Sequence, residues 1–268
     1  MTKILLFIIS IIWGYDYVKI PISWENVFQN GKIDLLNKNK FEINYIHYIC
    51  ETKGGEIFWE NSNYGLSAKY FNSGKMIKTD ALGNELGNFY CNQLLLKGIY
   101  KNKYKNYFKW QIEPSLLWQN IDTVFNIALA LNGKIEKEFK IVCFALNIEN
   151  FGMEIKSSDT KEYPPIHIYI QTSASLNQTN LFLNIGKFID EKLYFNIGIE
   201  QTVFNILKIG GGYNYRYTYL NIGESSDILN GLYTGFSLNY HNIRFNFIYS
   251  PFGVLGNVFR LSIGYLRF

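Results

Sequence analysis

The stretch Gly231–Phe268 decides the fold, because it holds three amphipathic runs in succession. They read GLYTGFSLNYH (Gly231–His241), RFNFIYS (Arg244–Ser250) and VFRLSIGYLRF (Val258–Phe268). In each run large apolar residues alternate with small or polar ones, and a period of two is typical of a strand with one apolar and one polar face. A final aromatic strand is typical of the closing strand of an outer-membrane β-barrel. An antiparallel soluble sheet is the alternative that these runs leave open.

The last strand departs from this pattern at its end. Its alternation places Arg267 on the apolar face and Phe268 on the polar one. A β-bulge near Tyr265 or Leu266 would return Phe268 to the apolar face.

Composition favours a membrane barrel. Aromatic residues make up 18% of the 268 residues, with 21 Tyr and 21 Phe, as expected for aromatic girdles at both membrane interfaces. The net charge is only +4 and no Lys/Arg cluster forms a stripe, so no nucleic-acid partner is predicted. Three widely spaced cysteines, Cys50, Cys91 and Cys143, predict small apolar strand residues and no disulfide framework.

The chain is expected to have three parts. Lys3 followed by the apolar stretch Ile4–Trp13 predicts a signal peptide over residues 1–14, which is too short to span a bilayer as a helix. Residues 15–40 are polar and irregular, and residues 41–268 form the barrel. Export followed by closure of the sheet predicts the bacterial outer membrane, with its lipid bilayer, as the location.

Period-two alternation predicts a single all-β domain, a transmembrane antiparallel β-barrel of about fourteen strands. Eleven strands precede the final three: Phe41–Ile49, Gly55–Asn61, Tyr64–Phe71, Phe89–Tyr100, Tyr107–Trp118, Val124–Asn132, Glu138–Ile148, Ile166–Leu176, Asn180–Phe188, Leu193–Gln201 and Ile206–Tyr217. The long gaps Asn72–Asn88, Glu149–Pro165 and Thr218–Asn230 all fall after odd-numbered strands, so they lie at one end. Short periplasmic turns and long outer loops produce this parity. Pro114 predicts a bulge or a strand end.

The segment YSPFGVLGNVFRLSIGYLRF (Tyr249–Phe268) resembles the closing hairpin of the PorV/PorQ family, which is related to the FadL-type transporters. The positions that carry the resemblance are Pro251, Gly253, Leu255, Gly256, Arg260, Leu261, Ser262 and Phe268. Tyr70–Phe89 and Asn150–Ile168 also resemble family segments. Residues 15–40 lack the small-residue segment and the Asn-Pro-Ala motif of the family, so a plug is not predicted there.

The resemblance implies a role in type IX secretion, with secreted cargo proteins and other secretion components as partners. The contacts would come from outer-loop residues, namely Lys78, Asp80, Glu85, Lys156, Asp159, Glu224 and Asp227. The alternative is FadL-like passage of small hydrophobic molecules, although the polar faces of the strands speak against an apolar pocket.

No enzyme, cofactor or metal is predicted. His47, His167 and His241 stand apart, without an HxH or HxxxH pair, and His167 and His241 are expected at polar faces or rims. The Gly210–Gly212 run lacks a GK[ST] ending and predicts a bend or close packing in the barrel wall. Acidic loop residues lack the spacing of a calcium loop and are expected to be solvated.

Overall fold

The computed structural model describes residues 19–21, 27–28, 33, 35, 39–49, 51–80, 82, 84–105, 107–156, 163–221 and 223–267. The predicted signal peptide, Cys50, Asp159 and Phe268 lie outside these residues. No helix in the described part of the chain is both long and apolar enough to span a membrane.

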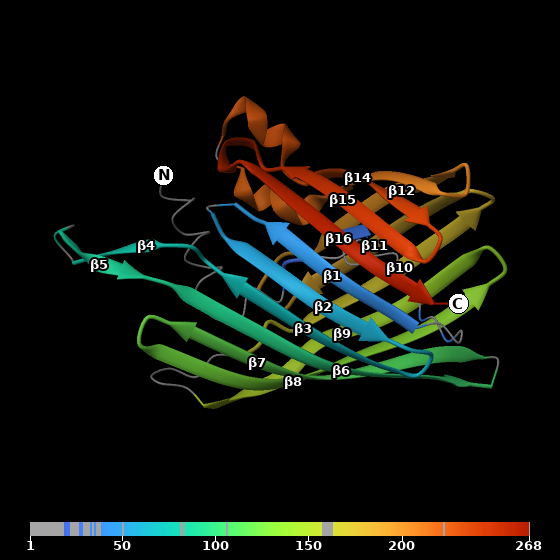
Figure 1. Ribbon diagram of the computed structural model, residues 1–268, viewed down its shortest axis with the longest axis horizontal. Helices are drawn as coiled ribbons and strands as arrows, with labels where there is room; N and C mark the ends of the chain where they lie inside the picture. The colour runs from blue at the N-terminus through green and yellow to red at the C-terminus, as the bar shows by residue number, and fades with distance from the viewer. Residues whose placement is uncertain are drawn as a thin grey trace.

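Fourteen antiparallel strands close into one barrel, which confirms the predicted fold (Figure 1). The barrel strands are β1 (Asn39–His47), β2 (Lys53–Glu60), β3 (Tyr64–Asn72), β6 (Cys91–Tyr104), β7 (Phe108–Ile121), β8 (Val124–Phe139), β9 (Val142–Lys156), β10 (His167–Leu176), β11 (Thr179–Phe188), β12 (Tyr194–Val203), β13 (Leu207–Asn214), β14 (Leu232–Tyr240), β15 (Ile243–Pro251) and β16 (Asn257–Arg267). Strand β1 pairs with β16, so the barrel has no open edge.

The alternation of the sequence separates a lipid face from a lumen. One apolar row runs across four neighbouring strands through the register pairs Phe245–Ile263, Ile263–Ile43 and Ile43–Ile57. Ile263, Ile43 and Ile57 are 60%, 51% and 53% exposed, as expected where lipid replaces a core. The residues between them, such as Ser262 and Asn44, are buried inside the barrel. The apolar side chains of the barrel therefore face the hydrocarbon of the bilayer, and the polar side chains face the lumen.

All long connections lie at one end, as the gap lengths predict. The opposite end has turns of two or three residues, such as 177–178 between β10 and β11. The long end carries the hairpin of β4 (Met76–Thr79) and β5 (Glu85–Phe89) and the 3-10 turns η2 (Tyr215–Leu220), η3 (Ser225–Leu229) and η4 (Gly253–Leu255). The hairpin is a separate two-stranded sheet that projects beyond the barrel wall (Figure 1).

Several predicted strand limits were wrong. The sequence predicted a turn at Gly133–Lys137, but β8 continues to Phe139 and β9 extends to Lys156. The inward Lys134 and Glu136 are 3.6 Å apart (Nζ to Oε2), and this ion pair supports polar residues within the wall. The predicted strand Ile206–Tyr217 ends at Asn214, because Asn214 caps η2 through its side chain.

Two predicted irregularities had different outcomes. Pro114 does not end its strand, since β7 pairs with β8 through Pro114 and Leu131. On the other side, pairing with β6 is interrupted between Lys97–Ser115 and Tyr100–Ile112, because proline has no N–H to donate. Strand β16 pairs regularly with β1 as far as Arg267, so the bulge that would return Phe268 to the apolar face is absent from Tyr265 to Arg267.

The described residues between 19 and 35 lie inside the barrel, where no plug was predicted. The carbonyl oxygens of Ile20 and Pro21 accept hydrogen bonds from Lys69 (2.5 Å) and Arg260 (2.9 Å). The backbone N–H of Ile33 donates to Glu136 Oε2 at 2.9 Å. These contacts run from β3 and β16 on one side to β8 on another, so the segment is held by the lumen wall.

Phe28 is the apolar anchor of this segment. It is fully buried and meets Phe182 and Tyr233 edge-to-face, with ring centroids 5.9 and 5.1 Å away. Gly210 makes room for it, since a Cβ there would lie 2.6 Å from Phe28 Cε1. The glycine run predicted to allow close packing in the wall therefore does so against the N-terminal segment.

Candidate functional site

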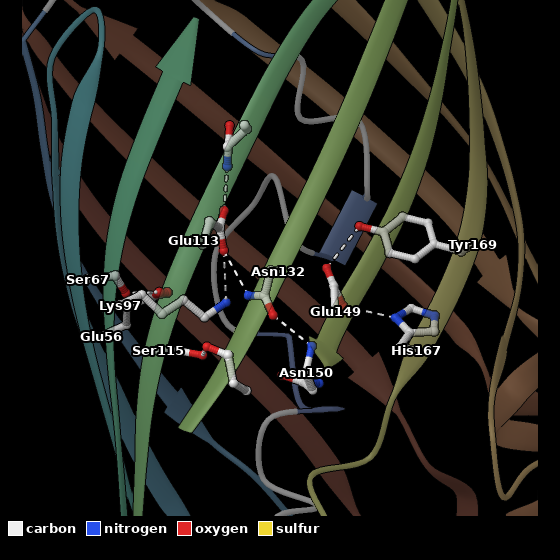
Figure 2. A network of polar contacts seen from close by, with 12 residues as sticks. Glu56, Ser67, Lys97, Glu113, Ser115, Asn132, Glu149, Asn150, His167 and Tyr169 are labelled. Carbon is white, nitrogen blue, oxygen red and sulfur yellow. Dashed lines mark hydrogen bonds and ion pairs between the residues drawn. The ribbon is translucent and has the colours of Figure 1, made fainter. Parts of the chain in front are cut away.

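A polar cavity of about 1140 Å³ occupies the lumen beside the N-terminal segment. Ile20, Pro21, Ile33 and Leu35 of that segment line it, together with inward side chains of the barrel strands. Carboxylates, ammonium groups and amides make up about half of the wall, and Figure 2 shows part of their network. We call this space the lumen cavity.

A β-bulge shapes one wall of the lumen cavity. Pairing of β8 with β9 shifts between Leu131 and Gly133, so that Glu149 and Asn150 face the single residue Asn132. Asn150 has a positive φ of 59°, and its N–H donates to Asn132 Oδ1 at 2.7 Å. Bulges re-aim side chains. The bulge at Asn132 directs the Glu149 side chain into the lumen. Glu149 therefore belongs to β9, and the prediction that it begins an outer loop was wrong.

Glu149 lies at the centre of a hydrogen-bonded cluster (Figure 2). Its Oε2 is 2.9 Å from His167 Nδ1, and its Oε1 accepts from the Tyr169 hydroxyl at 3.0 Å. The other nitrogen of His167 is 2.6 Å from the hydroxyl of Tyr194, and the ring stacks on Phe188 at 4.0 Å. His167 is thus a lumen residue with both ring nitrogens engaged, rather than a rim residue.

A second cluster centres on Glu113. Its Oε2 accepts from Asn132 Nδ2 at 3.0 Å and from Lys97 Nζ at 3.4 Å, and its Oε1 accepts from Gln111. A third contact joins Glu56 Oε1 to the hydroxyl of Ser67 at 2.8 Å. Figure 2 shows all three carboxylates facing the same interior. Each of these carboxylates therefore already has a donor on a neighbouring strand.

Several buried amides of the wall lack such partners within the described structure. Both amide atoms of Asn44, Asn184 and Asn246 have no hydrogen-bond partner, nor has Nδ2 of Asn147. Asn44 and Asn147 line the lumen cavity and are 2% and 3% exposed. Unpaired buried amides cost stability, and these amide atoms are too buried to contact a solute in the cavity.

The arrangement does not fit a metal. Glu136, Glu138 and Cys143 bring potential ligand atoms within 4.8 Å of one another. Lys109 Nζ, however, lies 3.6 Å from Glu136 and 3.1 Å from Glu138, and Lys134 also pairs with Glu136. These ammonium groups take the place that a cation would need.

The described residues proposed from the sequence for partner contacts lie at the end with the long connections, but not together. Lys78 pairs with Asp122 (2.6 Å), Asp80 accepts from the backbone of Leu82 and Asn84 in the hairpin turn, and Glu85 is exposed on β5. Lys156 covers the ring of Phe125 at 4.5 Å.

Asp227 belongs to η3, and Glu224 is the residue that precedes this turn. Asp227 was expected to be solvated, but it is 7% exposed and accepts from the backbone N–H groups of Gly223 and Glu224. Its role in the structure is to cap this turn.

The residues that carry the family resemblance form the closing hairpin. Pro251 ends β15, and Gly253 and Gly256 have positive φ of 52° and 102°, which explains the glycines. Leu255 ends η4. Arg260 points inward, where its Nη1 donates to Ser250 at 2.9 Å in addition to holding Pro21.

Sequence reasoning missed the lumen clusters. Glu113, Glu149 and His167 lie on different strands, and only the closed register brings them to one cavity. Inward position within an alternating strand is the signal that could have found them.

An ion cluster at the end with the long connections holds Lys19 of the N-terminal segment. Glu191, in the turn between β11 and β12, accepts two hydrogen bonds from Arg216 (2.8 and 2.9 Å) and one from Lys19 (3.0 Å). Arg216 also lies 4.4 Å above the Phe188 ring. Burial acts to raise the pKa of Glu191, but the hydrogen bond from Arg216 and the charges of Arg216 and Lys19 lower the pKa to about 2.

This pKa predicts an acid-sensitive contact. A carboxylate with a lowered pKa contributes stability above its unfolded-state pKa of about 4.5, and the contribution is lost as pH falls toward about 2. The Tm of wild type should therefore fall more steeply than that of Glu191→Gln over this window. Glu85→Gln, on the exposed hairpin, should follow the wild-type curve. Parallel curves for wild type and Glu191→Gln would contradict the assignment.

No family model matches the chain, and neither does any curated protein. Solved structures do share its fold. The toluene transporter TbuX of Ralstonia pickettii is 9% identical, with 86% of this chain and 88% of that chain covered, at a TM-score of 0.54. A deletion mutant of TodX, a monoaromatic hydrocarbon channel, is 9% identical over 85% of this chain and 88% of that one, at 0.52.

The outer-membrane protein Omp33 of Acinetobacter baumannii is 8% identical over 87% of this chain and 98% of that chain, with a TM-score of 0.50. At such identities the likeness concerns the fold alone. Of the resemblance to PorV/PorQ, only the FadL-like fold is shown. The fold is that of FadL-type outer-membrane channels such as TodX and TbuX.

Proposed function

We propose that this protein is an outer-membrane channel for small molecules, with the lumen cavity as its binding chamber. The observation that carries the proposal is the cavity itself: a closed barrel encloses about 1140 Å³ lined by inward side chains. Ligand cavities of proteins are of this order, roughly 300–1,000 Å³. The fold shared with hydrocarbon channels supports the FadL-like alternative drawn from the sequence more than the secretion role.

The N-terminal segment defines how such a channel would work. Its contacts with Lys69, Arg260 and Glu136 place it in the solute path. A solute would bind in the lumen cavity beside the described residues Ile20, Pro21 and Ile33. Much of the wall is polar, so we expect water to fill the chamber. Passage of purely hydrophobic molecules therefore remains a prediction.

Solute flux tests the proposal. Purified protein in liposomes should speed osmotic swelling in isotonic solutions of small solutes, and cells that express it should take up labelled toluene or a labelled sugar faster than a deletion strain. Protein whose β-barrel has been heat-denatured before reconstitution is the control. Swelling and uptake no faster than in that control, for every solute, would refute the channel function.

The type IX secretion role implied by the PorV/PorQ resemblance is a separate prediction, and the comparisons give it no support. It requires cargo contacts at Lys78, Asp80, Glu85, Lys156, Glu224 and Asp227, with Asp159 outside the described residues. Accumulation of a defined set of proteins in the periplasm of the deletion strain would favour it over the channel.

A further inference from the structure

We propose that Lys208 on β13 and Arg244 on β15 form a binding site in the lumen cavity for a small dicarboxylate. The inference rests on the proposed function and names the substrate class of the same cavity. Both side chains line the cavity and both are partly exposed. A solute in the cavity can therefore reach both charges.

Lys208 is a cation without a carboxylate partner. Among the described residues it forms no ion pair, whereas other lysines of the cavity wall do, such as Lys97 with Glu113 and Lys134 with Glu136. A half-buried ammonium group loses part of its hydration, and an opposite charge beside it compensates that loss. An anion from solution can supply this charge at Lys208.

Arg244 places a second positive charge on the same wall. Its Nε donates to Oδ1 of Asn239 at 2.9 Å, and this bond holds the guanidinium against β14. Asn239 and Ser237 are successive inward residues of β14, and they lie opposite Arg244 and Lys208 respectively. The two cations are therefore separated by one strand, which places their backbones roughly 10 Å apart across the sheet.

The wall around this pair is positively charged. Strands β13, β14, β15 and β16 contain no Asp or Glu. Strand β12 contributes one carboxylate, Glu200, which is 1% exposed and lies opposite Gly210 rather than Lys208. Of the described residues that line the cavity, ten are Lys or Arg and seven are Glu. An anion is therefore attracted to this side of the lumen.

Lys103 on β6 shows that an unpaired lysine alone does not make such a site. It also lines the cavity without an ion pair to any described residue, but its register partner is Lys109. Lys109 lies 3.6 Å from Glu136 and 3.1 Å from Glu138, so carboxylates already balance the charge of this wall. The wall that carries Lys208 has no such carboxylates on the strands between it and β1.

Two cations on one wall favour a ligand with two carboxylates. A guanidinium binds a carboxylate through two parallel N–H···O bonds, and an ammonium group binds another carboxylate as a point charge. A monocarboxylate neutralises one of the two cations, and a hydrocarbon neutralises neither. We therefore expect succinate to bind more tightly than acetate.

Equilibrium dialysis of the purified full chain against labelled succinate at low ionic strength tests the site. Wild type should bind succinate about tenfold more tightly than acetate, because the second carboxylate meets the second cation. The double variant Lys208→Gln/Arg244→Gln should weaken succinate binding about tenfold or more, since it removes both charges. The exchanged pair, Lys208→Arg/Arg244→Lys, keeps both charges and should keep most of the affinity. The heat-dependent shift in gel mobility shows that each variant is folded.

Lys103→Gln is the matched control, because it removes one cation from the same cavity on the opposite side of the barrel. Lys208→Gln alone should weaken succinate binding, and Lys103→Gln should leave it unchanged. Equal weakening by these two variants would mean that only the net charge of the lumen attracts succinate, which would overturn the site. Equal affinities of wild type for succinate and acetate would overturn the ligand class.

Liposome swelling separates this inference from the channel function. Succinate binding without any solute flux would leave the binding site standing and refute transport. Solute flux without succinate binding would leave transport standing and overturn the inference.

Discussion

Replacing Phe28 with alanine is expected to increase the flux of small solutes through the barrel and to lower its thermal stability. Phe28 is fully buried between Phe182 and Tyr233, and truncating a buried phenylalanine typically costs about 3–5 kcal/mol. The lost contacts join Phe28 of the N-terminal segment to Phe182 and Tyr233 of the barrel wall. The substitution therefore weakens the packing of this segment against the wall. Liposome swelling measures the flux, and the Tm in detergent measures the stability.

Two pairs of variants sharpen this test. Phe204→Ala removes a phenyl group that is 83% exposed on a short turn, and it should change neither quantity. Gly210→Ala should act like Phe28→Ala, because its Cβ would lie 2.6 Å from the Phe28 ring, whereas Gly211→Ala meets its nearest atom at 3.4 Å. If Phe28→Ala leaves flux unchanged while the Tm falls, the segment does not limit passage.

The second large effect concerns the lipid face. Ile263→Arg is expected to destabilise the barrel by about 2–4 kcal/mol, the cost of an arginine facing the middle of the bilayer. Ile263 is 60% exposed, within the apolar row that includes Ile43 and Phe245. Unfolding by urea in lipid vesicles, followed by the heat-dependent shift in gel mobility, measures the change.

Ile77→Arg is the matched control, because Ile77 has nearly the same exposure, 56%, but lies on the β4–β5 hairpin outside the barrel wall. Its substitution should cost little, since its surroundings are aqueous. Similar costs at Ile77 and Ile263 would mean that the wall around Ile263 does not face lipid.

Local alternation accounts for what the sequence predicted correctly. The runs of Gly231–Phe268 became β14, β15 and β16, with Phe236, Leu261 and Ile263 outward and Ser237 and Ser262 inward. A lipid-facing strand must expose apolar side chains on one side at every second residue, so the pattern is visible in any single strand. Gap lengths likewise showed which end carries the long connections.

The predicted limits failed where a contact with another strand overrode the local pattern. Gly133–Lys137 has the composition of a turn, yet it stays in β8, where Glu136 pairs inside the wall with Lys109 of the neighbouring strand β7. The bulge at Asn150 depends on Asn132, a residue of the neighbouring strand. In each contact, the sequence around one residue does not identify its partner on the neighbouring strand.

By itself, the sequence determined that this protein is a fourteen-stranded antiparallel barrel with long loops at one end. Only the tertiary structure decided that Ile20, Pro21 and Phe28 lie within the barrel and that Glu113, Glu149 and His167 share a cavity with Asn44 and Asn147. The physical reason is that strand alternation is a local requirement of the membrane, repeated along each strand. The contents of the lumen depend instead on contacts between residues far apart in the chain, which the closed register alone brings together.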